Sequence, residues 1–276
     1  NDILELAAGA FLTPGSSTVY SRHAFAVYPL ATQARGARGI VVPAIDYCHD
    51  LEAMLGAVGQ DTRIVFIANP NNPTGTYLPA AGIESFLNRL PGEVVAVLDE
   101  AYNEYLPMEL RSDSVALLKR HRNLIVSRTF SKAYGLAGLR VGYGFMDPAV
   151  ADLLNRLRQP FNVNSLALAA AVAALDDQEF VQRSYELNRS GMAQLEAGLQ
   201  KLGLNWIKSY GNFISFELPR KGGKPSAGDV YNRLLCQGVI VRPLGGYEMP
   251  DHLRVTVGTA EENRIFLAAL EKAITP

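Results

Sequence analysis

The sequence has few cysteines, little net charge and no long apolar run. Cys48 and Cys236 are the two cysteines among 276 residues, and they lie far apart without C-x-x-C spacing. This pair suggests neither a disulfide framework nor a zinc site, so both are expected to be free thiols in a reducing compartment. The formal net charge of -1 gives no electrostatic reason to expect binding to nucleic acid or to an anionic membrane.

No stretch approaches the roughly 20 apolar residues that span a bilayer, and no secretory signal is recognisable. We therefore expect a cytoplasmic protein without a membrane span. Hydrophobic residues make up 48% of the chain and charged residues 19%, which is typical of a globular protein with a sizeable core. The chain begins with Asn rather than Met, and this leads us to expect that an upstream part of a longer protein is absent.

Short apolar runs of strand length recur in the first half of the chain. They include R-I-V-F-I-A at residues 63–68, V-V-A-V-L at residues 94–98 and L-I-V at residues 124–126. Such runs are typical of parallel strands that are buried on both faces. Helical patterns separate them, which predicts a mainly parallel sheet with helices on both faces. Further strands in this half are predicted at residues 19–21, 39–43 and 139–145.

The second half of the chain indicates a smaller unit. A helix predicted over residues 179–202 leads into it, and K-G-G-K-P-S at residues 221–226 is expected to be an exposed loop. The sequence therefore predicts two domains, with the boundary between residues 185 and 186. Within the second unit, strands are predicted at residues 206–218, 239–242 and 253–257, and helices at residues 229–237 and 261–274.

Polar residues follow two of the apolar runs. N-P-N-N-P-T-G comes after residues 63–68, and D-E-A-Y comes after residues 94–98. The carboxyl ends of parallel strands are where open α/β sheets place ligands. Asp99 either caps the next helix or pairs with a protonated ring nitrogen. Glu100 and Glu104 are interpreted as solvated or structural residues.

The segment T-F-S-K-A-Y-G-L-A-G-L-R-V-G places a lysine among anion-binding groups. Lys132 has hydroxyls beside it at Thr129 and Ser131, and Arg140 follows eight residues later. A lysine that forms a Schiff base with pyridoxal phosphate needs a nearby site for the cofactor's phosphate, and hydroxyls and an arginine suit that anion. A lone S-K would instead be a surface lysine in a turn. The glycine spacing does not match a G-x-G-x-x-G dinucleotide fingerprint.

This segment resembles the cofactor-lysine motif of fold-type I pyridoxal-phosphate enzymes, and S-K-A-Y-G-L-A-G-L-R-V-G is similar to that of the histidinol-phosphate aminotransferase family of class II. The resemblance covers essentially the whole chain, with the family's N-terminal part absent. It implies a large cofactor-binding α/β domain at residues 1–185, incomplete at its N-terminus, and a small C-terminal α/β domain at residues 186–276. It also implies a homodimer with shared active sites that binds pyridoxal 5'-phosphate.

The resemblance also assigns roles to single residues. It implies that Lys132 carries the cofactor, that Asp99 pairs with the pyridine nitrogen, and that these two residues and Tyr102 are catalytic. Asn72 and Tyr102 would both bond the cofactor's phenolic oxygen. Phe25 is the candidate for stacking on the pyridine ring, although an ordinary core phenylalanine is nearly as good an interpretation. The residues implied for the phosphate are Thr129, Ser131 and Arg140.

Two arginines of the second domain resemble the family's anion-binding residues. They are Arg242 in V-I-V-R-P and Arg254 in L-R-V-T-V-G-T. An arginine forms forked pairs with carboxylate or phosphate, although a strand-end surface charge is the usual fate of this residue. We expect both at strand ends that face the cleft.

The function that the resemblance implies is transamination of histidinol phosphate with 2-oxoglutarate, a step of histidine biosynthesis. Two alternatives within the same fold stay open, an aromatic amino-acid aminotransferase and a phospho-amino-acid decarboxylase. A third alternative is a non-catalytic regulatory domain that binds pyridoxal phosphate.

Overall fold

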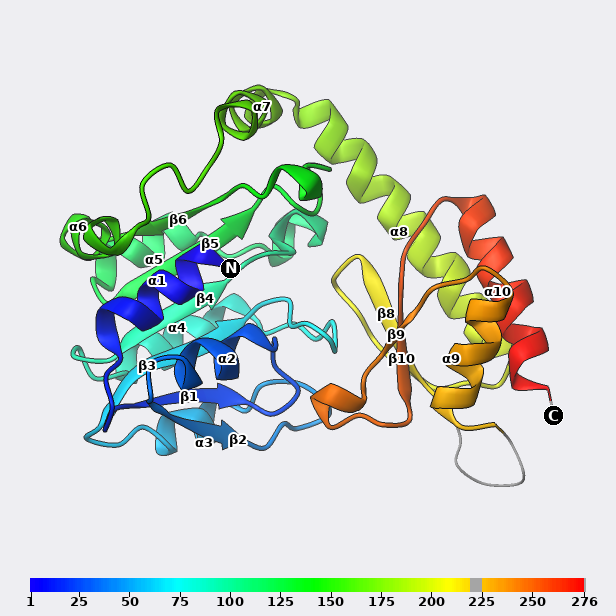
Figure 1. Ribbon diagram of the computed structural model, residues 1–276, viewed down its shortest axis with the longest axis horizontal. Helices are drawn as coiled ribbons and strands as arrows, with labels where there is room; N and C mark the ends of the chain where they lie inside the picture. Colours follow the sequence, from blue (N-terminus) through cyan, green and yellow to red (C-terminus); the bar gives the residue numbers. More distant parts are fainter. Residues whose placement is uncertain (219–224, 276) are drawn as a thin grey trace.

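Two β-sheets, one of six strands and one of four, organise residues 1–218 and 225–275, which are the residues that the computed structural model describes. The expected loop at residues 221–226 lies mostly outside them. The six-stranded sheet and its helices form the left part of Figure 1, and the four-stranded sheet lies in the right part.

The larger sheet is mainly parallel, as predicted. Its strand order is β2-β1-β3-β4-β5-β6, and only the β5–β6 pair is antiparallel among the pairs described. Parallel neighbours end at the same edge of the sheet, so the residues that follow β3, β4 and β5 are brought together. The strands are β1 (Ser17–Ser21), β2 (Arg38–Val42), β3 (Thr62–Ala68), β4 (Val95–Asp99), β5 (Leu124–Thr129) and β6 (Gly142–Met146).

Helices cover both faces of this sheet. Ile64 and Phe66 of β3 pack toward one set of helices, and Val65 and Ile67 pack toward the other. This alternation follows from the two-residue period of a strand, and burial on both faces explains the continuous apolar runs. The first face is covered by α1 (Asp2–Phe11), α2 (Val27–Gln33) and α6 (Pro148–Leu157), and the second by α3 (Leu51–Gly56), α4 (Ala80–Arg89) and α5 (Ser114–Arg120).

A long helix, α8 (Gln178–Lys201), leads from the larger part of the molecule to the smaller one (Figure 1). It follows α7 (Ser165–Asp176) and has 24 residues, so it is roughly 36 Å long. Leu195 and Leu199, near its end, are fully buried in the core of the smaller part. The predicted domain boundary between residues 185 and 186 falls inside α8 and stays a prediction.

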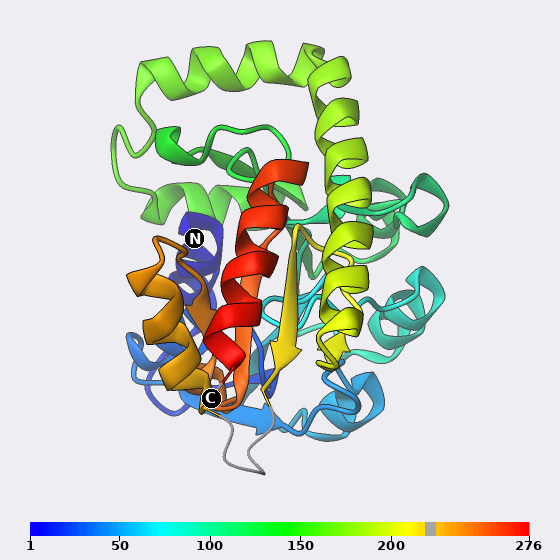
Figure 2. The same cartoon turned by 90° about the vertical axis from the view of Figure 1, so that its right-hand side faces the viewer.

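The smaller sheet is antiparallel and has the order β7-β8-β10-β9. In Figure 2, α9 and α10 lie in front of it and α8 beside them. Ile214 and Phe216 join the core under these helices, and Trp206 packs against that core. The elements not yet bounded are β7 (Trp206–Ile207), β8 (Phe213–Glu217), α9 (Ala227–Cys236), β9 (Arg242–Pro243), β10 (His252–Thr256) and α10 (Ala260–Ile274).

Two predicted strands are shorter than expected. The prediction for residues 139–145 was wrong at its start, because Ala137–Leu139 form a 3₁₀ turn and Arg140 adopts a left-handed conformation with φ 56. The prediction for residues 239–242 was also wrong, since the strand is Arg242–Pro243. The Val239 amide bonds the Leu234 carbonyl at the end of α9, and Pro243 has no amide hydrogen to extend the pairing.

The expectations about cysteines and apolar runs can also be compared with the structure. Cys48 is half-buried and Cys236 is exposed, and both are free thiols as predicted. Within the described residues, no helix combines the length and the apolarity that crossing a membrane requires.

Candidate active site

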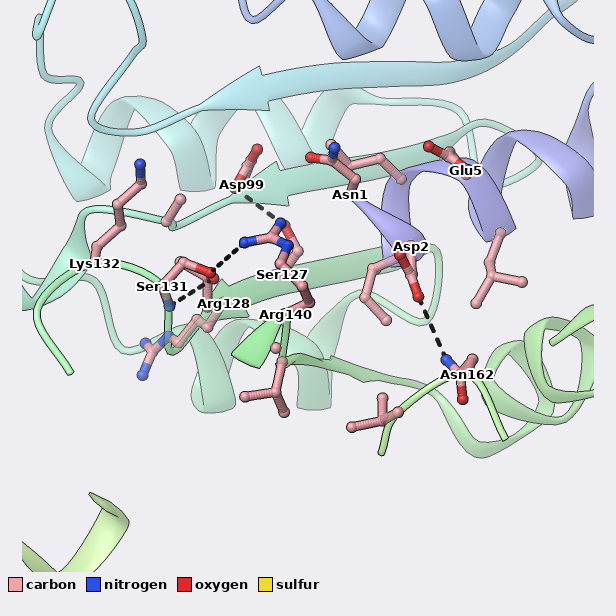
Figure 3. Close-up of a pocket in the computed structure, with 18 of the residues that line it drawn as sticks. Asn1, Asp2, Glu5, Asp99, Ser127, Arg128, Ser131, Lys132, Arg140 and Asn162 are labelled. Carbon is pink, nitrogen blue, oxygen red and sulfur yellow. Dashed lines mark hydrogen bonds between the residues drawn. The ribbon is translucent and has the colours of Figure 1, made fainter. Parts of the chain in front are cut away.

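A cavity of about 1160 Å³ lies at the carboxyl ends of β3, β4 and β5. The topology of the sheet explains this place, because these three neighbouring strands deliver their following loops to one edge. Eight of the ten residues predicted for the site line the cavity: Phe25, Asn72, Asp99, Tyr102, Thr129, Ser131, Lys132 and Arg140. Figure 3 shows several of these side chains and the hydrogen bonds between them.

Asp99, the last residue of β4, presents a half-buried carboxylate to the cavity. The Tyr28 hydroxyl donates to its Oδ2 at 3.0 Å, and the Ser127 hydroxyl donates to its Oδ1 at 3.2 Å. Burial raises the pKa of Asp99, and the two hydrogen bonds oppose that rise by stabilising the ionised form. The carboxylate is therefore held in one orientation and aimed at the cavity.

Lys132 lies three residues after the end of β5. Its Nζ is 5.3 Å from the centre of the Tyr102 ring. Burial lowers the pKa of the Lys132 amine, and the positive charges of Arg254 and Arg140 lower it further. A lowered pKa increases the fraction of neutral amine, which is the form that attacks a carbonyl.

Arg140 and two hydroxyls form a polar cluster beside Lys132. Nη1 of Arg140 lies 3.3 Å from the Ser131 hydroxyl and donates to the Ala137 carbonyl at 2.7 Å. The Ser131 amide donates to the Thr129 hydroxyl at 3.1 Å. Arg140 holds φ 56, a strained conformation that residues other than glycine rarely adopt and that often marks a functional site. A guanidinium, hydroxyls and a backbone amide together are suited to an anion.

Asn72 reaches the cavity from the loop that follows β3, and it is bonded by Arg254 of β10. Arg254 is half-buried, with its guanidinium 4.9 Å from the centre of the Phe213 ring. Because an arginine has only donors, it must bond the amide oxygen of Asn72, and the amide nitrogen is then free to donate elsewhere. Arg254 lies at the centre of β10 rather than at a strand end, which corrects that expectation.

Arg242 lies outside the cavity lining and is exposed. It is the register partner of Arg254 in the antiparallel β9–β10 pair, so both side chains leave the same face of the sheet. Burial lowers the pKa of Arg254, and the charge of Arg242 lowers it further. The structure therefore brings the two predicted arginines together at the edge of the site.

Two of the aromatic residues that line the cavity, Tyr102 and Phe25, were predicted for the site. Tyr102 is buried and makes an edge-to-face contact with Phe213 of the smaller sheet, with ring centres 5.2 Å apart. Burial raises the pKa of Tyr102 far above its usual value, so its hydroxyl stays protonated and is able to donate. Phe25 lines the cavity and makes an edge-to-face contact with Tyr28. The stacking role of Phe25 stays a prediction.

Glu100 and Glu104 are both buried, so the interpretation as solvated residues was wrong and the structural interpretation holds. Arg128 donates to Oε2 of Glu100 from Nε at 2.9 Å and from Nη2 at 2.8 Å, and Ser114 bonds Oε1. This buried pair joins the ends of β4 and β5, one residue beyond Asp99.

Tyr28, which bonds Asp99 across 71 residues of chain, was not among the residues predicted for the site. Tyr28 is fully buried in α2, and its ring stacks on Phe66 with centres 4.7 Å apart. A usable signal was present, because Tyr28 lies three residues before the buried Ala31 on one helical face, and a buried tyrosine hydroxyl needs a partner.

Comparison with known proteins gives a consistent answer. A family model described as "Aminotransferase class I and II" matches residues 1–270. Histidinol-phosphate aminotransferase 2 of Nitrosospira multiformis is 61% identical over 274 residues, which are 99% of this chain and 69% of the relative. Histidinol-phosphate aminotransferase 1 of Cupriavidus pinatubonensis is 62% identical over 275 residues, which are 99% of this chain and 72% of the relative.

Solved structures agree with these matches. The histidinol-phosphate aminotransferase of Sinorhizobium meliloti, solved in complex with pyridoxal-5'-phosphate, superimposes with a TM-score of 0.92 at 30% identity and covers 99% of this chain and 74% of its own. The enzyme of the same name from Clostridium acetobutylicum has a TM-score of 0.88 at 22% identity, covers 98% of this chain and 80% of its own, and is similar in fold. Because the family match spans nearly all of the chain, and the chain covers more than two thirds of relatives about 60% identical to it, this protein belongs to the aminotransferase class I and II family.

Proposed function

We propose that this protein is a pyridoxal-phosphate-dependent aminotransferase that transfers the amino group of histidinol phosphate to 2-oxoglutarate. The observation that carries the proposal is one cavity lined by Lys132, Asp99 and Arg140, in a chain whose relatives of 61% and 62% identity are histidinol-phosphate aminotransferases. The reaction belongs to histidine biosynthesis.

The residues of the cavity fit pyridoxal 5'-phosphate. Lys132 offers an amine with a lowered pKa, which suits a bond to an aldehyde. Thr129, Ser131 and Arg140 offer donors for the phosphate. Asp99 offers a half-buried carboxylate for the pyridine nitrogen. The predicted roles of these residues are part of the proposal.

When bound, the cofactor supplies an electron sink for the carbanion that forms at the substrate carbon. Asp99, anchored by Tyr28 and Ser127, favours the protonated ring nitrogen because a negative charge in a buried site raises the pKa of its partner. Lys132 acts as base and acid, and it moves a proton at the substrate carbon. Tyr102, whose raised pKa keeps its hydroxyl protonated, and the amide nitrogen of Asn72, which Arg254 leaves free, would donate to the phenolic oxygen.

The smaller sheet supplies the site for the substrate's anion. Histidinol phosphate carries a phosphate and no carboxylate, whereas 2-oxoglutarate carries two carboxylates. Arg254 and Arg242 share one face of this sheet and suit both anions, since the planar fork of an arginine matches phosphate and carboxylate oxygens alike.

The homodimer is part of the same proposal, and its support is an exposed apolar face. Phe161 is 96% exposed, and Leu166 and Val172 of α7 are 75% and 67% exposed. Large apolar side chains that are exposed to this degree on one segment mark an interaction surface. Phe161 and Leu168 also line the cavity, so a second copy seated here would complete the wall of the site.

The two free thiols support a reducing compartment, so we place this dimer in the cytoplasm. We also propose that the cofactor-binding domain extends to about residue 185 and that residues 186–276 form the smaller domain. In this arrangement the cavity belongs to the larger domain. Arg254 reaches its lining residue Asn72 from the smaller domain, and Arg242 lies beside Arg254, outside the lining.

The test is direct. Purified protein is mixed with pyridoxal phosphate, its absorption spectrum is measured, and glutamate formation is followed with histidinol phosphate and 2-oxoglutarate. Phenylalanine in place of histidinol phosphate is the matched comparison. We expect histidinol phosphate to be the better donor by kcat/KM. A preference for phenylalanine would contradict the substrate, and no spectral change and no amino transfer from either donor would contradict the enzyme.

A further inference from the structure

Ser215 is a buried polar residue in a strand that is otherwise mostly apolar. β8 reads F-I-S-F-E, and Ser215 is 0% exposed at its centre. Its hydroxyl donates to the Pro73 carbonyl at 2.6 Å, across 142 residues of chain. A buried hydroxyl is retained at little cost only when it is bonded, so this contact fixes the strand against the loop that contains Pro73.

That loop, residues 69–76, carries Asn72 to the cavity and is closed by two backbone hydrogen bonds of its own. The Gly75 amide bonds the Asn71 carbonyl at 2.8 Å, and the Asn71 amide bonds the Thr76 carbonyl at 2.9 Å. Because of these bonds, we expect a displacement of one loop residue to displace its neighbours. The position of the loop, and of Asn72 within it, then depends on the residues that contact it.

The smaller part of the molecule touches this loop at three points. The Tyr210 amide donates to the Gly75 carbonyl at 2.8 Å, Ser215 bonds Pro73, and Arg254 bonds Asn72. The approach is close, because a Cβ on Gly75 would collide with the side chain of Ser209.

Ser215 and Arg254 act as neighbours in this contact. They are register partners in the antiparallel β8–β10 pair, so their side chains leave the same face of the sheet. They bond two consecutive residues of the loop, Pro73 and Asn72. The opposite face, with Ile214 and Phe216, is fully buried in the apolar core. The sheet thus holds the loop from a rigid base.

We propose that Ser215 is a positioning residue for the reaction, acting through Asn72. Its bond to Pro73 fixes the position of Asn72 between Arg254 and the cavity. In that position the amide oxygen of Asn72 accepts from the Arg254 guanidinium, and its amide nitrogen is left to donate into the cavity. The proposal rests on the proposed function, in which Asn72 contacts the cofactor and Arg254 contacts the substrate.

A double-mutant cycle tests this role. Ser215→Ala, Asn72→Ala and the double variant are compared with the wild type for kcat, KM and the pH dependence of the absorption spectrum of bound pyridoxal phosphate. We expect Ser215→Ala to lower kcat/KM roughly five- to tenfold, the effect of removing about one hydrogen bond. We also expect it to shift the spectral titration, and we expect neither effect in the Asn72→Ala background. Ser215→Thr, which keeps the hydroxyl, should restore much of the activity.

Ser17→Ala is the matched control, because Ser17 is also 0% exposed and bonds Thr62 at the far end of the larger sheet. It should lower the unfolding midpoint about as much as Ser215→Ala without changing the spectrum. The proposal would be overturned if Ser215→Ala had the wild-type spectrum and kcat/KM. It would also be overturned if the decrease in kcat/KM in the double variant equalled the product of the two single decreases.

A cofactor-free measurement separates this inference from the proposed function. Hydrogen exchange of the Asn71 and Gly75 amides should be faster in Ser215→Ala than in the wild type and unchanged in Ser17→Ala. A wild type that transfers no amino group refutes the proposed function, while unchanged exchange in Ser215→Ala refutes the hold of Ser215 on the loop.

Discussion

The two sheets use their residues in different ways. The central strands of the six-stranded sheet, β3, β4 and β5, are apolar on both faces and become polar toward their carboxyl ends, at Asp99 of β4 and Ser127 of β5. The four-stranded sheet is apolar on one face, and on the other it carries Ser215 and Arg254. One sheet therefore places its functional groups at an edge, and the other places them on a face.

Because of this difference, we expect the two sheets to contribute differently to stability and to catalysis. Asp99 at the end of β4 and Lys132 after β5 are half-buried titratable groups. Burial raises the pKa of Asp99 and lowers the pKa of Lys132, so it disfavours both charged forms. In the smaller part, α9 and α10 both begin with capping boxes, and an unbroken apolar core lies under them. We expect mutations at the edge of the larger sheet to affect chemistry, and mutations under the smaller sheet to affect folding.

Lys132→Ala should give the largest effect on the chemical side. We expect transamination to fall by several powers of ten, each about 1.4 kcal/mol of barrier, because in the proposed function Lys132 is both the base and the anchor of the cofactor. The cofactor-free protein should melt at the wild-type temperature or above, since a buried amine is removed. Activity, cofactor absorption and thermal unfolding are the measurements, and normal turnover with an unchanged spectrum would refute the assignment of Lys132.

Phe216→Ala tests the folding side. Phe216 is fully buried and lies next to Ser215, on the other face of β8. Removing the ring should lower the free energy of unfolding by about 3–5 kcal/mol, because apolar burial decreases and a cavity remains. Denaturant unfolding measures this decrease, and activity per folded molecule should survive well below the melting temperature. If catalysis fell sharply while stability did not, the separation between the two faces would be wrong.

Local sequence patterns were enough to predict two of the central strands and part of the site. The apolar runs at residues 63–68 and 94–98 are the observed β3 and β4 within one residue, because a strand buried on both faces leaves a local signature. The motif around Lys132 likewise identified its partners Thr129, Ser131 and Arg140, which lie close in sequence and line one cavity.

Contacts between distant segments could not be predicted in this way. Arg254 bonds Asn72 across 182 residues, and neither local pattern contains the other residue. Glu100 was interpreted partly as solvated because its neighbours in sequence do not reveal that Arg128, on the next strand, would pair with it. Such pairings depend on strand order and register, which only the assembled sheet fixes.

Arg242→Ala sharpens the comparison at the substrate end. In the proposed function Arg242 donates one charge-assisted hydrogen bond to the phosphate, worth about 1.5–3 kcal/mol, so we expect the variant to raise KM for histidinol phosphate roughly ten- to hundredfold. Phenylalanine, which has no phosphate, should be affected much less. Arg264→Ala is the matched control, because Arg264 is an exposed arginine of α10 that pairs with Glu261. Equal increases in KM for histidinol phosphate and phenylalanine would show that Arg242 does not bind the phosphate.

The smallest effect expected is a pH dependence of stability at Asp99. Burial raises the pKa of Asp99 in the folded protein above the unfolded value of about 3.9. The folded state then binds this proton more tightly, so its contribution favours folding at low pH and is lost as pH rises through the folded pKa. In cofactor-free protein, Asp99→Asn should therefore become more stable relative to the wild type as pH rises above the unfolded value of about 3.9 and through the folded pKa. Unfolding curves at several pH values measure the difference, and a constant difference would contradict it.

The position of Trp206 has a practical consequence. It is the one tryptophan of the chain, and it packs against the core of the smaller part, far in sequence from the cavity residues of the larger sheet. Its fluorescence will therefore report the melting of the smaller part alone, while the absorption of bound cofactor reports the larger. Measuring both signals in one heating experiment shows whether the two parts unfold together or one after the other. It therefore shows whether a single melting temperature describes this protein.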